Sequence, residues 1–536
     1  MQRSRLAAAA AFFILVLPYI ALGVWLQHAK GLQSLAAFVV SVLLLEWLLA
    51  MAARTWRVFL LIQFPLLLLS VVFTAYTIAL SGPPGDFIAY VLATTSWEEV
   101  RGFLGIWQGT RWLLAAVMLA LLYLWLALWC APQPISSGRN LRVRYGVLGA
   151  VAVLSAYAAR SPAAFIDGIA VNPLIGTAMF LAGPMRMAVA QVNGTGLRKL
   201  PYGASRTGPE EVHILIIGES ARRASWSVYG YERKTTPFLE QLGGEAVFFQ
   251  HAVADANYTA RVVPILLTGM SPDRFDMASV RGNLVDLARE AGYSTAWLMN
   301  QDPHISLAVG VHADQMHYPP PISSVMSGHL PRDEVLLPDL QRALERRGAA
   351  QFIGLHVIGS HWEYLSRYPP SFERYDVGHD LGFMSASSPR SGQHVVNSYD
   401  NSVIYTDWFL QQVIERARKL SVPATVTFIS DHGEDLFALD GNAGHGSSTF
   451  TAHQFDIPAF VWMNAAYRSA HADKARAIAQ NAGKEIRSHN LFYSMGDLMS
   501  IRWPGESPAE SFASADFVPD SNTPVIAGDK LVAFGN

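Results

Sequence analysis

Hydrophobic residues dominate the first 160 positions of the chain in long, uninterrupted runs. Four runs, over residues 6–26, 32–53, 58–80 and 112–131, each contain about 20 residues, and Glu46 is the one charged side chain among them. A helix needs about 20 apolar residues to cross the hydrocarbon core of a bilayer. A fifth run, over residues 143–160, is shorter, but its flanking arginines can extend to the headgroups. The pattern therefore predicts five transmembrane helices.

Glu46 lies within the second predicted span, where a charged side chain is costly. A local hydrogen-bonding partner accounts for such a residue more simply than a proton relay does. We therefore expect Glu46 to have a local pairing partner.

The pattern changes after residue 210, where short apolar runs rich in β-branched residues alternate with amphipathic segments. The runs predict strands over 212–217, 293–299, 351–357, 424–429 and 458–463. The amphipathic segments predict helices over 236–242, 283–291, 336–347, 399–420 and 489–499. Apolar strands separated by helices are typical of a largely parallel sheet with both faces covered. The expected organisation is a transmembrane domain (1–160), a connecting segment (161–209) and an α/β domain (210–536).

The connecting segment is too interrupted by proline and glycine to cross a bilayer. Residues 172–192 carry little charge and several large apolar side chains, which predicts a helix lying at the membrane surface. Residues 194–209 are rich in glycine, serine and proline and predict a linker.

Charge separates the chain into the same two parts. Residues 1–200 contain 14 basic and 5 acidic side chains, whereas residues 201–536 contain 26 basic and 37 acidic ones. Seven basic residues fall in the predicted cytoplasmic pieces and three in the outer loops, which places the N-terminus in the cytoplasm and the α/β domain outside. The acidic second part excludes a basic nucleic-acid groove. Cys130 is the only cysteine, which excludes a disulfide scaffold.

Candidate metal ligands follow three of the predicted strands. Glu219 comes directly after the first strand, Asp431 and His432 follow the strand at 424–429, and His361 follows the strand at 351–357. His445 lies shortly after the Asp-His pair. Each of these residues alone is commonly a helix cap or a surface histidine. Because the carboxyl ends of parallel strands meet at one edge, their agreement predicts a metal site, and carboxylates with imidazoles suit zinc.

Two hydroxyl groups are candidate nucleophiles. Ser220 is adjacent to Glu219, and Thr259 opens a predicted helix, where the positive end of the helix dipole and a nearby zinc ion would favour its ionised form. A helix-capping role for Thr259 explains the same position. These observations do not choose between the two hydroxyls.

Five longer motifs occur in the chain: GESARRASWSVYGYERKTTPFL from Gly218, NYTARVVPILLTG from Asn257, HVIGSHWEYLSRYPPSFERY from His356, YDNSVIYTDWFL from Tyr399 and SDHGEDL from Ser430. Together with the five predicted spans, they resemble the bacterial inner-membrane phosphoethanolamine transferases. This family includes the lipid A-modifying and colistin-resistance enzymes and belongs to the alkaline phosphatase/sulfatase superfamily. The resemblance implies an alkaline phosphatase/sulfatase-like fold for the α/β domain and a periplasmic location.

The resemblance also implies roles for individual residues. Glu219, Asp431 and His432 would bind one zinc ion tightly, with Thr259 as fourth ligand and nucleophile, and Ser220 would be a bystander. His361 and His445 would bind the donor phosphate or a second zinc ion during turnover, and act in catalysis. In the loop over 81–111, Glu98 would contact the donor head group, although Tyr90 stands where the family has an asparagine.

The implied reaction transfers phosphoethanolamine from phosphatidylethanolamine to an acceptor through a phosphoethanolamine–threonine intermediate, and releases diacylglycerol. The resemblance also implies a monomeric protein embedded in membrane lipids. The acceptor is lipid A or the core of lipopolysaccharide, or another periplasmic glycan. The second part of the chain lacks the disulfides that are usual in lipid A-modifying members and reads WLMNQDPH where those members carry a cysteine- and lysine-bearing segment. These departures favour core sugars or periplasmic glucans.

Two other enzymatic functions remain alternatives. One is a glycerol-phosphate transferase similar to the lipoteichoic acid synthases, and the other is a membrane-anchored sulfatase or phosphodiesterase. A sensor with an inactive domain would lack a ligand or the nucleophile, and none of these residues is missing from the sequence.

Overall fold

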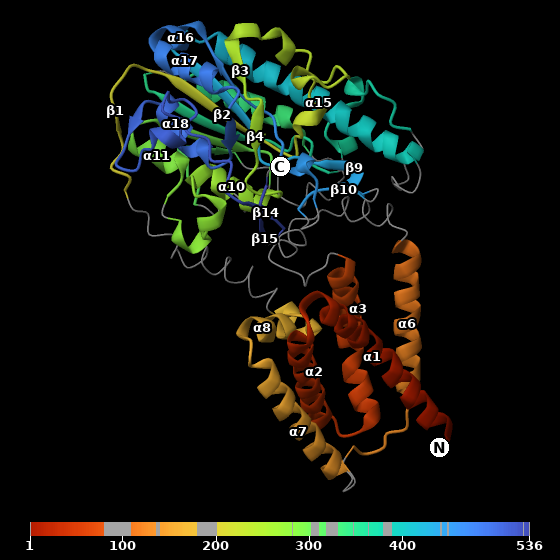
Figure 1. Ribbon diagram of the computed structural model, residues 1–536. Coiled ribbons are helices and arrows are strands. Elements are labelled where there is room, and N and C mark those ends of the chain that lie inside the picture. Colours follow the sequence, from red (N-terminus) through yellow and green to blue (C-terminus); the bar gives the residue numbers. More distant parts are fainter. Residues whose placement is uncertain are drawn as a thin grey trace. The chain divides into compact units, whose positions relative to one another are not determined.

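The computed structural model describes residues 2–79, 109–135, 140–178, 201–280, 282–301, 310–317, 331–346, 348–362, 364–378, 389–439, 442–446, 450–528 and 530–534. The chain divides into two compact units. The first comprises Met1–Ala93 and Gln108–Ala188, and the second comprises Thr94–Trp107 and Val189–Asn536 (Figure 1).

Helices occupy all five predicted spans of the first unit. They are α1 (Gln2–Lys30), α2 (Leu32–Ala52), α3 (Trp56–Ala79), α6 (Gly109–Trp129) and α7 (Asn140–Ala158) (Figure 1). Among the described residues, three helical stretches are long and apolar enough to cross a membrane: Leu6–Lys30, Leu32–Ala52 and Trp56–Thr74. The N-terminal unit is therefore an apolar helical bundle with at least these three candidate spans.

Side-chain hydrogen bonds join the helices of the bundle, as two examples illustrate. The Tyr123 hydroxyl of α6 donates a hydrogen bond to the Leu60 carbonyl oxygen of α3 at 2.8 Å. The Gln63 amide of α3 donates to the Glu46 carboxylate of α2. The expectation of a local partner for Glu46 is confirmed.

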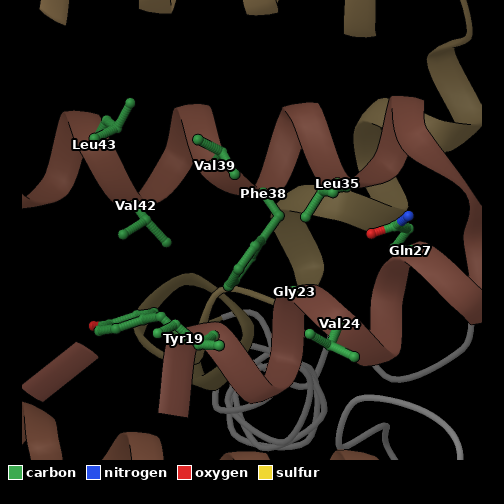
Figure 2. A pocket seen from close by; sticks show the side chains of 10 residues that line it. Tyr19, Gly23, Val24, Gln27, Leu35, Phe38, Val39, Val42 and Leu43 are labelled. Atoms are coloured by element: carbon green, nitrogen blue, oxygen red, sulfur yellow. The ribbon is translucent and has the colours of Figure 1, made fainter. Parts of the chain in front are cut away.

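An apolar groove of about 340 Å³ lies between α1 and α2. Figure 2 shows Tyr19, Gly23 and Val24 of α1 on one side and Phe38 and Val42 of α2 on the other.

The short helix α8 (Pro162–Ala170) packs tightly against α2. A Cβ on Gly168 would lie 2.2 Å from the Ser34 carbonyl oxygen, so only glycine permits this approach. Residues 173–178 are also helical. The rest of the predicted surface helix, from residue 179 to 192, lies outside the described residues.

The second unit is built on a seven-stranded sheet in the order β3-β11-β8-β2-β7-β5-β6. The strands are β3 (Ala246–Phe248), β11 (Ala459–Met463), β8 (Ala424–Ser430), β2 (Val212–Gly218), β7 (Gln351–His356), β5 (Ser294–Met299) and β6 (Gln315–His317). Strands β8, β2, β7, β5 and β6 are mutually parallel, whereas β11 runs antiparallel to both of its neighbours. The largely parallel sheet predicted from the sequence is confirmed, and β11 is its antiparallel exception.

Both faces of this sheet are covered. Every residue of β2 is buried, as expected for a central parallel strand. On one face, alternate β2 residues such as Ile214 and Ile216 join a core with Leu340 and Leu410. Among the described residues, the α-helices of this unit are α10 (Thr259–Thr268), α11 (Leu284–Glu290), α14 (Leu337–Leu344), α15 (Pro389–Arg418), α16 (Ala465–Ala470), α17 (Ala472–Asn481) and α18 (Asn490–Leu498).

In the described part of the chain, four two-stranded pairings lie outside the main sheet. They join β1 (Ser205–Arg206) to β13 (Ile501–Arg502), β9 (Asp435–Leu439) to β10 (Asn442–Gly444), β12 (Glu485–Arg487) to β4 (His251–Val253), and β14 (Val525–Ala527) to β15 (Lys530–Val532). Because β1 falls within the predicted linker, the end of that linker is tied to the second unit.

The predicted helix over 236–242 is wrong. Only a single 3₁₀ turn forms there, at Leu239–Gln241. Gly243, with φ of 51°, ends the segment after little more than one turn. At its start, the backbone N–H groups of Phe238 and Leu239 donate to the Asp407 carboxylate at 2.9 and 3.1 Å. The predicted helix at 399–420 begins earlier, because Pro389 occupies the first position of α15, where proline is well tolerated.

Candidate metal centre

Two neighbouring strands bring the predicted carboxylates together. Strands β2 and β8 are parallel and paired in register, with Gly218 opposite Ser430. The next residue on each strand is therefore Glu219 on one side and Asp431 on the other, and the Asp431 N–H donates to the Gly218 carbonyl at 3.0 Å. Glu219, Asp431 and His432 are at most 1% exposed. The pairing of the sheet thus sets the spacing between these side chains.

Ser220 has a backbone conformation that non-glycine residues rarely adopt, with φ of 54°. Its N–H donates to Asp431 Oδ1 at 3.1 Å, and its hydroxyl donates to Glu219 Oε1 at 2.7 Å. The Tyr399 hydroxyl donates to the Ser220 carbonyl at 2.7 Å and accepts the Arg222 N–H at 2.9 Å. These bonds hold a turn that costs about 1–2 kcal/mol. Ser220 therefore orients both carboxylates.

Thr259 lies against this pair at the beginning of α10. Tyr258 occupies the N-cap position, so the Thr259 hydroxyl does not cap the helix. Instead, Thr259 Oγ1 lies 3.2 Å from Glu219 Oε2 and 3.2 Å from His432 Nε2. Of the two candidate nucleophiles, Thr259 is the one whose hydroxyl faces both a carboxylate and an imidazole.

Both histidines of the second predicted pair lie beside these residues. The rings of His432 and His445 are 4.1 Å apart, and those of His361 and His445 are 6.2 Å apart. Ligand atoms of Glu219, His432 and His445 lie within 4.8 Å of one another. His445 follows β10, and its Nδ1 contacts Glu434 Oε2 at 3.1 Å. The structure thus brings together six of the seven predicted site residues.

The seventh, Glu98, falls in the loop over 81–111 and lies outside the described residues.

The electrostatics of the cluster favour a bound cation. Burial, reinforced by the negative charge of Asp431, raises the pKa of Glu219 well above its usual range. Burial also raises the pKa of Asp431, and Asp431 Oδ2 is buried without a hydrogen-bond partner. Two carboxylates buried side by side repel each other, and a divalent cation removes that cost.

His432 is prepared as a neutral ligand. Burial, together with the nearby His445, lowers the pKa of His432 well below its usual range. Its Nδ1–H donates to the Gly433 carbonyl at 2.8 Å, so Nε2 is the nitrogen that presents a lone pair. Two carboxylates, an imidazole and a hydroxyl form a donor set that zinc accepts. The residues therefore fit the predicted metal.

Three residues outside the predicted set also contribute to the site among the described residues. Gln301, two residues beyond β5, donates from Nε2 to Glu219 Oε2 at 2.6 Å. Glu434 contacts His445, and Tyr399 holds Ser220. A signal for Gln301 was available, because it follows an apolar strand just as Glu219 does. Tyr399 carries no such signal, since it acts from the middle of a helix.

Comparison with known proteins places this fold and site in a family. The sulfatase family matches residues 212–501, more than half of the chain, and the chain belongs to it. Phosphoethanolamine transferase EptC of Escherichia coli K12 is 25% identical over 315 residues, covering 57% of this chain and 53% of that protein. The chain thus spans about half the length of the first curated relatives it matches.

Two solved structures have the same fold. The integral membrane lipooligosaccharide phosphoethanolamine transferase A from Neisseria meningitidis covers 95% of this chain and 98% of its own, with a TM-score of 0.69 and 21% identity. The C-terminal periplasmic domain of Escherichia coli EptC in complex with zinc covers 63% of this chain and 96% of its own, with a TM-score of 0.54 and 22% identity. The predicted resemblance is confirmed at the level of family and fold.

Proposed function

We propose that the protein transfers phosphoethanolamine from phosphatidylethanolamine to a lipopolysaccharide acceptor or another periplasmic glycan. The observation that carries this proposal is the position of Thr259 Oγ1, 3.2 Å from both Glu219 Oε2 and His432 Nε2. Relatives named as phosphoethanolamine transferases and the sulfatase-family match support the same reaction class. The acceptor is lipid A, a core sugar or a glucan.

Zinc is the proposed cofactor, held by Glu219, Asp431, His432 and Thr259. When bound, it would stabilise the ionised Thr259 oxygen and the negative charge that develops on the phosphoryl oxygens. The zinc complex of a related domain supports this choice of metal.

The Thr259 oxygen attacks the phosphorus of the donor phosphodiester. A bond forms between Oγ1 and phosphorus, and the bond from phosphorus to the glycerol oxygen breaks. We assign His445 as the group that protonates the departing oxygen, releasing diacylglycerol. Although burial alone would lower it, the pKa of His445 is raised overall by the Glu434 carboxylate, which suits a proton donor. An acceptor hydroxyl, which gives its proton to the now neutral His445, or an acceptor phosphate then attacks the phosphorus, and the bond from phosphorus to Oγ1 breaks, which frees the threonine.

The His361 ring lies 6.2 Å from the His445 ring, and the two histidines would together bind the donor phosphate or a second zinc ion. The zinc content of the purified protein during turnover distinguishes these roles: one ion per chain favours phosphate binding, and two favour a second metal. Glu98 is proposed to contact the ethanolamine head group.

The proposed setting is the bacterial inner membrane. Five helices (about 6–26, 32–53, 58–80, 112–131 and 143–160) would span it, with the N-terminus in the cytoplasm. Residues 161–209 would connect them to a periplasmic catalytic domain over 210–536 in a monomeric protein. Such an arrangement keeps the site near a donor that is itself a membrane lipid.

The purified full chain in detergent, incubated with fluorescent phosphatidylethanolamine, tests the reaction. Diacylglycerol should appear with the wild-type chain, and mass spectrometry should find one phosphoethanolamine group on the peptide that contains Thr259. Release of diacylglycerol from phosphatidylglycerol instead would favour the glycerol-phosphate transferase alternative. Mass spectrometry of lipopolysaccharide and periplasmic glucans, with and without the protein, would identify the acceptor.

A further inference from the structure

The exit of β5 contributes a side chain to the site from the WLMNQDPH segment, outside the five longer motifs. Gln301 lies two residues beyond Met299, the last residue of β5, and is only 7% exposed. Its Nε2 donates a hydrogen bond to Glu219 Oε2 at 2.6 Å. The two residues are 82 positions apart in sequence, so the sheet brings them together.

We propose that Gln301 is a positioning residue, which holds the Glu219 carboxylate in the orientation that binds zinc without itself contacting metal or substrate. This inference rests on the zinc-dependent function proposed above.

The hydrogen bonds to Glu219 show why a neutral donor is useful at this place. Glu219 Oε2 accepts from both Gln301 Nε2 and Thr259 Oγ1, at 2.6 and 3.2 Å. When Thr259 loses its proton, Oε2 loses one of its two donors and faces a negatively charged oxygen. The Gln301 amide keeps its N–H and continues to stabilise the carboxylate. An amide does so without adding a positive charge that would compete with the metal.

The rotation of the Glu219 carboxylate is set by contacts on both of its oxygens. Ser220 Oγ donates to Oε1 at 2.7 Å, and Gln301 donates to Oε2. Removing Gln301 would leave Oε2 with Thr259 as its donor, and the carboxylate could then rotate more freely about the Cγ–Cδ bond of Glu219. Metal binding would have to restrict that rotation, and affinity would fall accordingly.

The backbone before Gln301 is fixed independently of the metal. The Asn300 N–H donates to the His356 carbonyl at 2.8 Å, and its side-chain amide donates to Asp333 Oδ1 at 3.0 Å. Asp333 also accepts the Gly359 N–H at 3.0 Å. These bonds tie the exits of β5 and β7 together. Gln301 therefore starts from a rigid position, as a positioning residue requires.

Replacing Gln301 with methionine tests the inference, because methionine has a similar length and volume and no amide donor. The matched control is Gln341→Met, which makes the same change on the exposed surface of α14. Both variants and the wild type are prepared as full chains in detergent. The dissociation constant for zinc is measured by competition with a chromophoric chelator, and kcat and KM are measured with phosphatidylethanolamine at saturating zinc.

The expected result is a dissociation constant for zinc about 10–100-fold higher for Gln301→Met, the range typical when a partner of a metal ligand is lost. At saturating zinc, kcat should fall while KM for the donor stays unchanged, and Gln341→Met should match the wild type. Gln301→Asn, which keeps the amide on a shorter side chain, should lie between wild type and Gln301→Met. Melting curves in chelator would show whether each variant is folded.

An unchanged zinc affinity in folded Gln301→Met would overturn the inference. A raised KM with unchanged zinc affinity would also overturn it, by making Gln301 a donor-binding residue. If the wild-type chain bound no zinc, the proposed function itself would fail. That result differs from a failure of the Gln301 inference, because it does not depend on position 301.

Discussion

The loop after β7 approaches the first metal-ligand candidate so closely that a single methyl group should disturb it. Gly359 has φ of 48°, and a Cβ built on it would lie 2.8 Å from the Glu219 carbonyl oxygen and 3.1 Å from the Glu219 nitrogen. The Ser360 N–H donates to that carbonyl at 3.0 Å, which keeps the two segments together. We predict that Gly359→Ala both destabilises the second unit and weakens zinc binding.

The magnitude has two parts. An alanine with positive φ costs about 1–2 kcal/mol, and forcing a methyl group into a packed site costs about 1–3 kcal/mol. The sum is about 2–5 kcal/mol. The second unit contains 362 residues, which gives an unfolding entropy of about 0.8 kcal/mol per kelvin at about 2.1 cal/mol/K per residue. The melting temperature should therefore fall by about 3–7 °C.

Two other glycines separate these contributions. Gly243 has φ of 51° and nothing within 4 Å of an added Cβ, so Gly243→Ala carries the backbone strain alone. Gly244 has neither positive φ nor a close neighbour, so Gly244→Ala carries neither cost. Melting is followed by circular dichroism in chelator, and zinc affinity by chelator competition. If Gly359→Ala melts at the same temperature as Gly243→Ala and binds zinc like the wild type, the close approach to Glu219 does not matter.

Three further outcomes are expected. Thr259→Ala should abolish release of diacylglycerol, and full activity in that variant would return Ser220 as nucleophile. Zinc binding should release protons and strengthen as pH rises. The reason is that burial and the neighbouring Asp431 raise the pKa of Glu219, and the proton that Glu219 holds without metal must leave when zinc binds. Calorimetry in buffers of different ionisation enthalpy measures the proton release, and equal heats in all buffers would contradict it. Tyr399→Phe removes the partner of two buried backbone groups, the Ser220 carbonyl and the Arg222 N–H, and should cost about 2–5 kcal/mol of stability. A melting temperature within about 1 °C of the wild type, which corresponds to a loss of less than about 1 kcal/mol, would refute this prediction.

The strands and the main ligands were accessible from the sequence for a simple reason. A buried parallel strand needs a continuous apolar run, and whatever follows such a run lies at the edge where ligands bind. Glu219 and Asp431 were found in this way. Gln301 satisfies the same rule, but a side-chain amide neither ionises nor commonly binds zinc. Its position after a strand therefore predicts no role until its hydrogen-bond partner is known.

Other features depend on contacts between distant segments. The Asp407 carboxylate of α15 accepts the backbone N–H groups of Phe238 and Leu239, so the start of the 3₁₀ turn at Leu239–Gln241 is held by a residue far away in sequence. The strained turn at Ser220 depends on Tyr399, 179 residues away. Neither local propensity nor periodicity contains this information, because the partner is supplied by the fold.

The pairing of Gly218 with Ser430 also makes the centre tolerant of change elsewhere. Adjacent strands lie about 4.8 Å apart whatever connects them, so the distance between the residues that follow them is a property of the sheet. Loops that approach from outside, such as the one carrying His445, can lengthen, shorten or change composition without altering that distance. The surrounding loops can therefore be remodelled while the two carboxylates remain where the sheet places them.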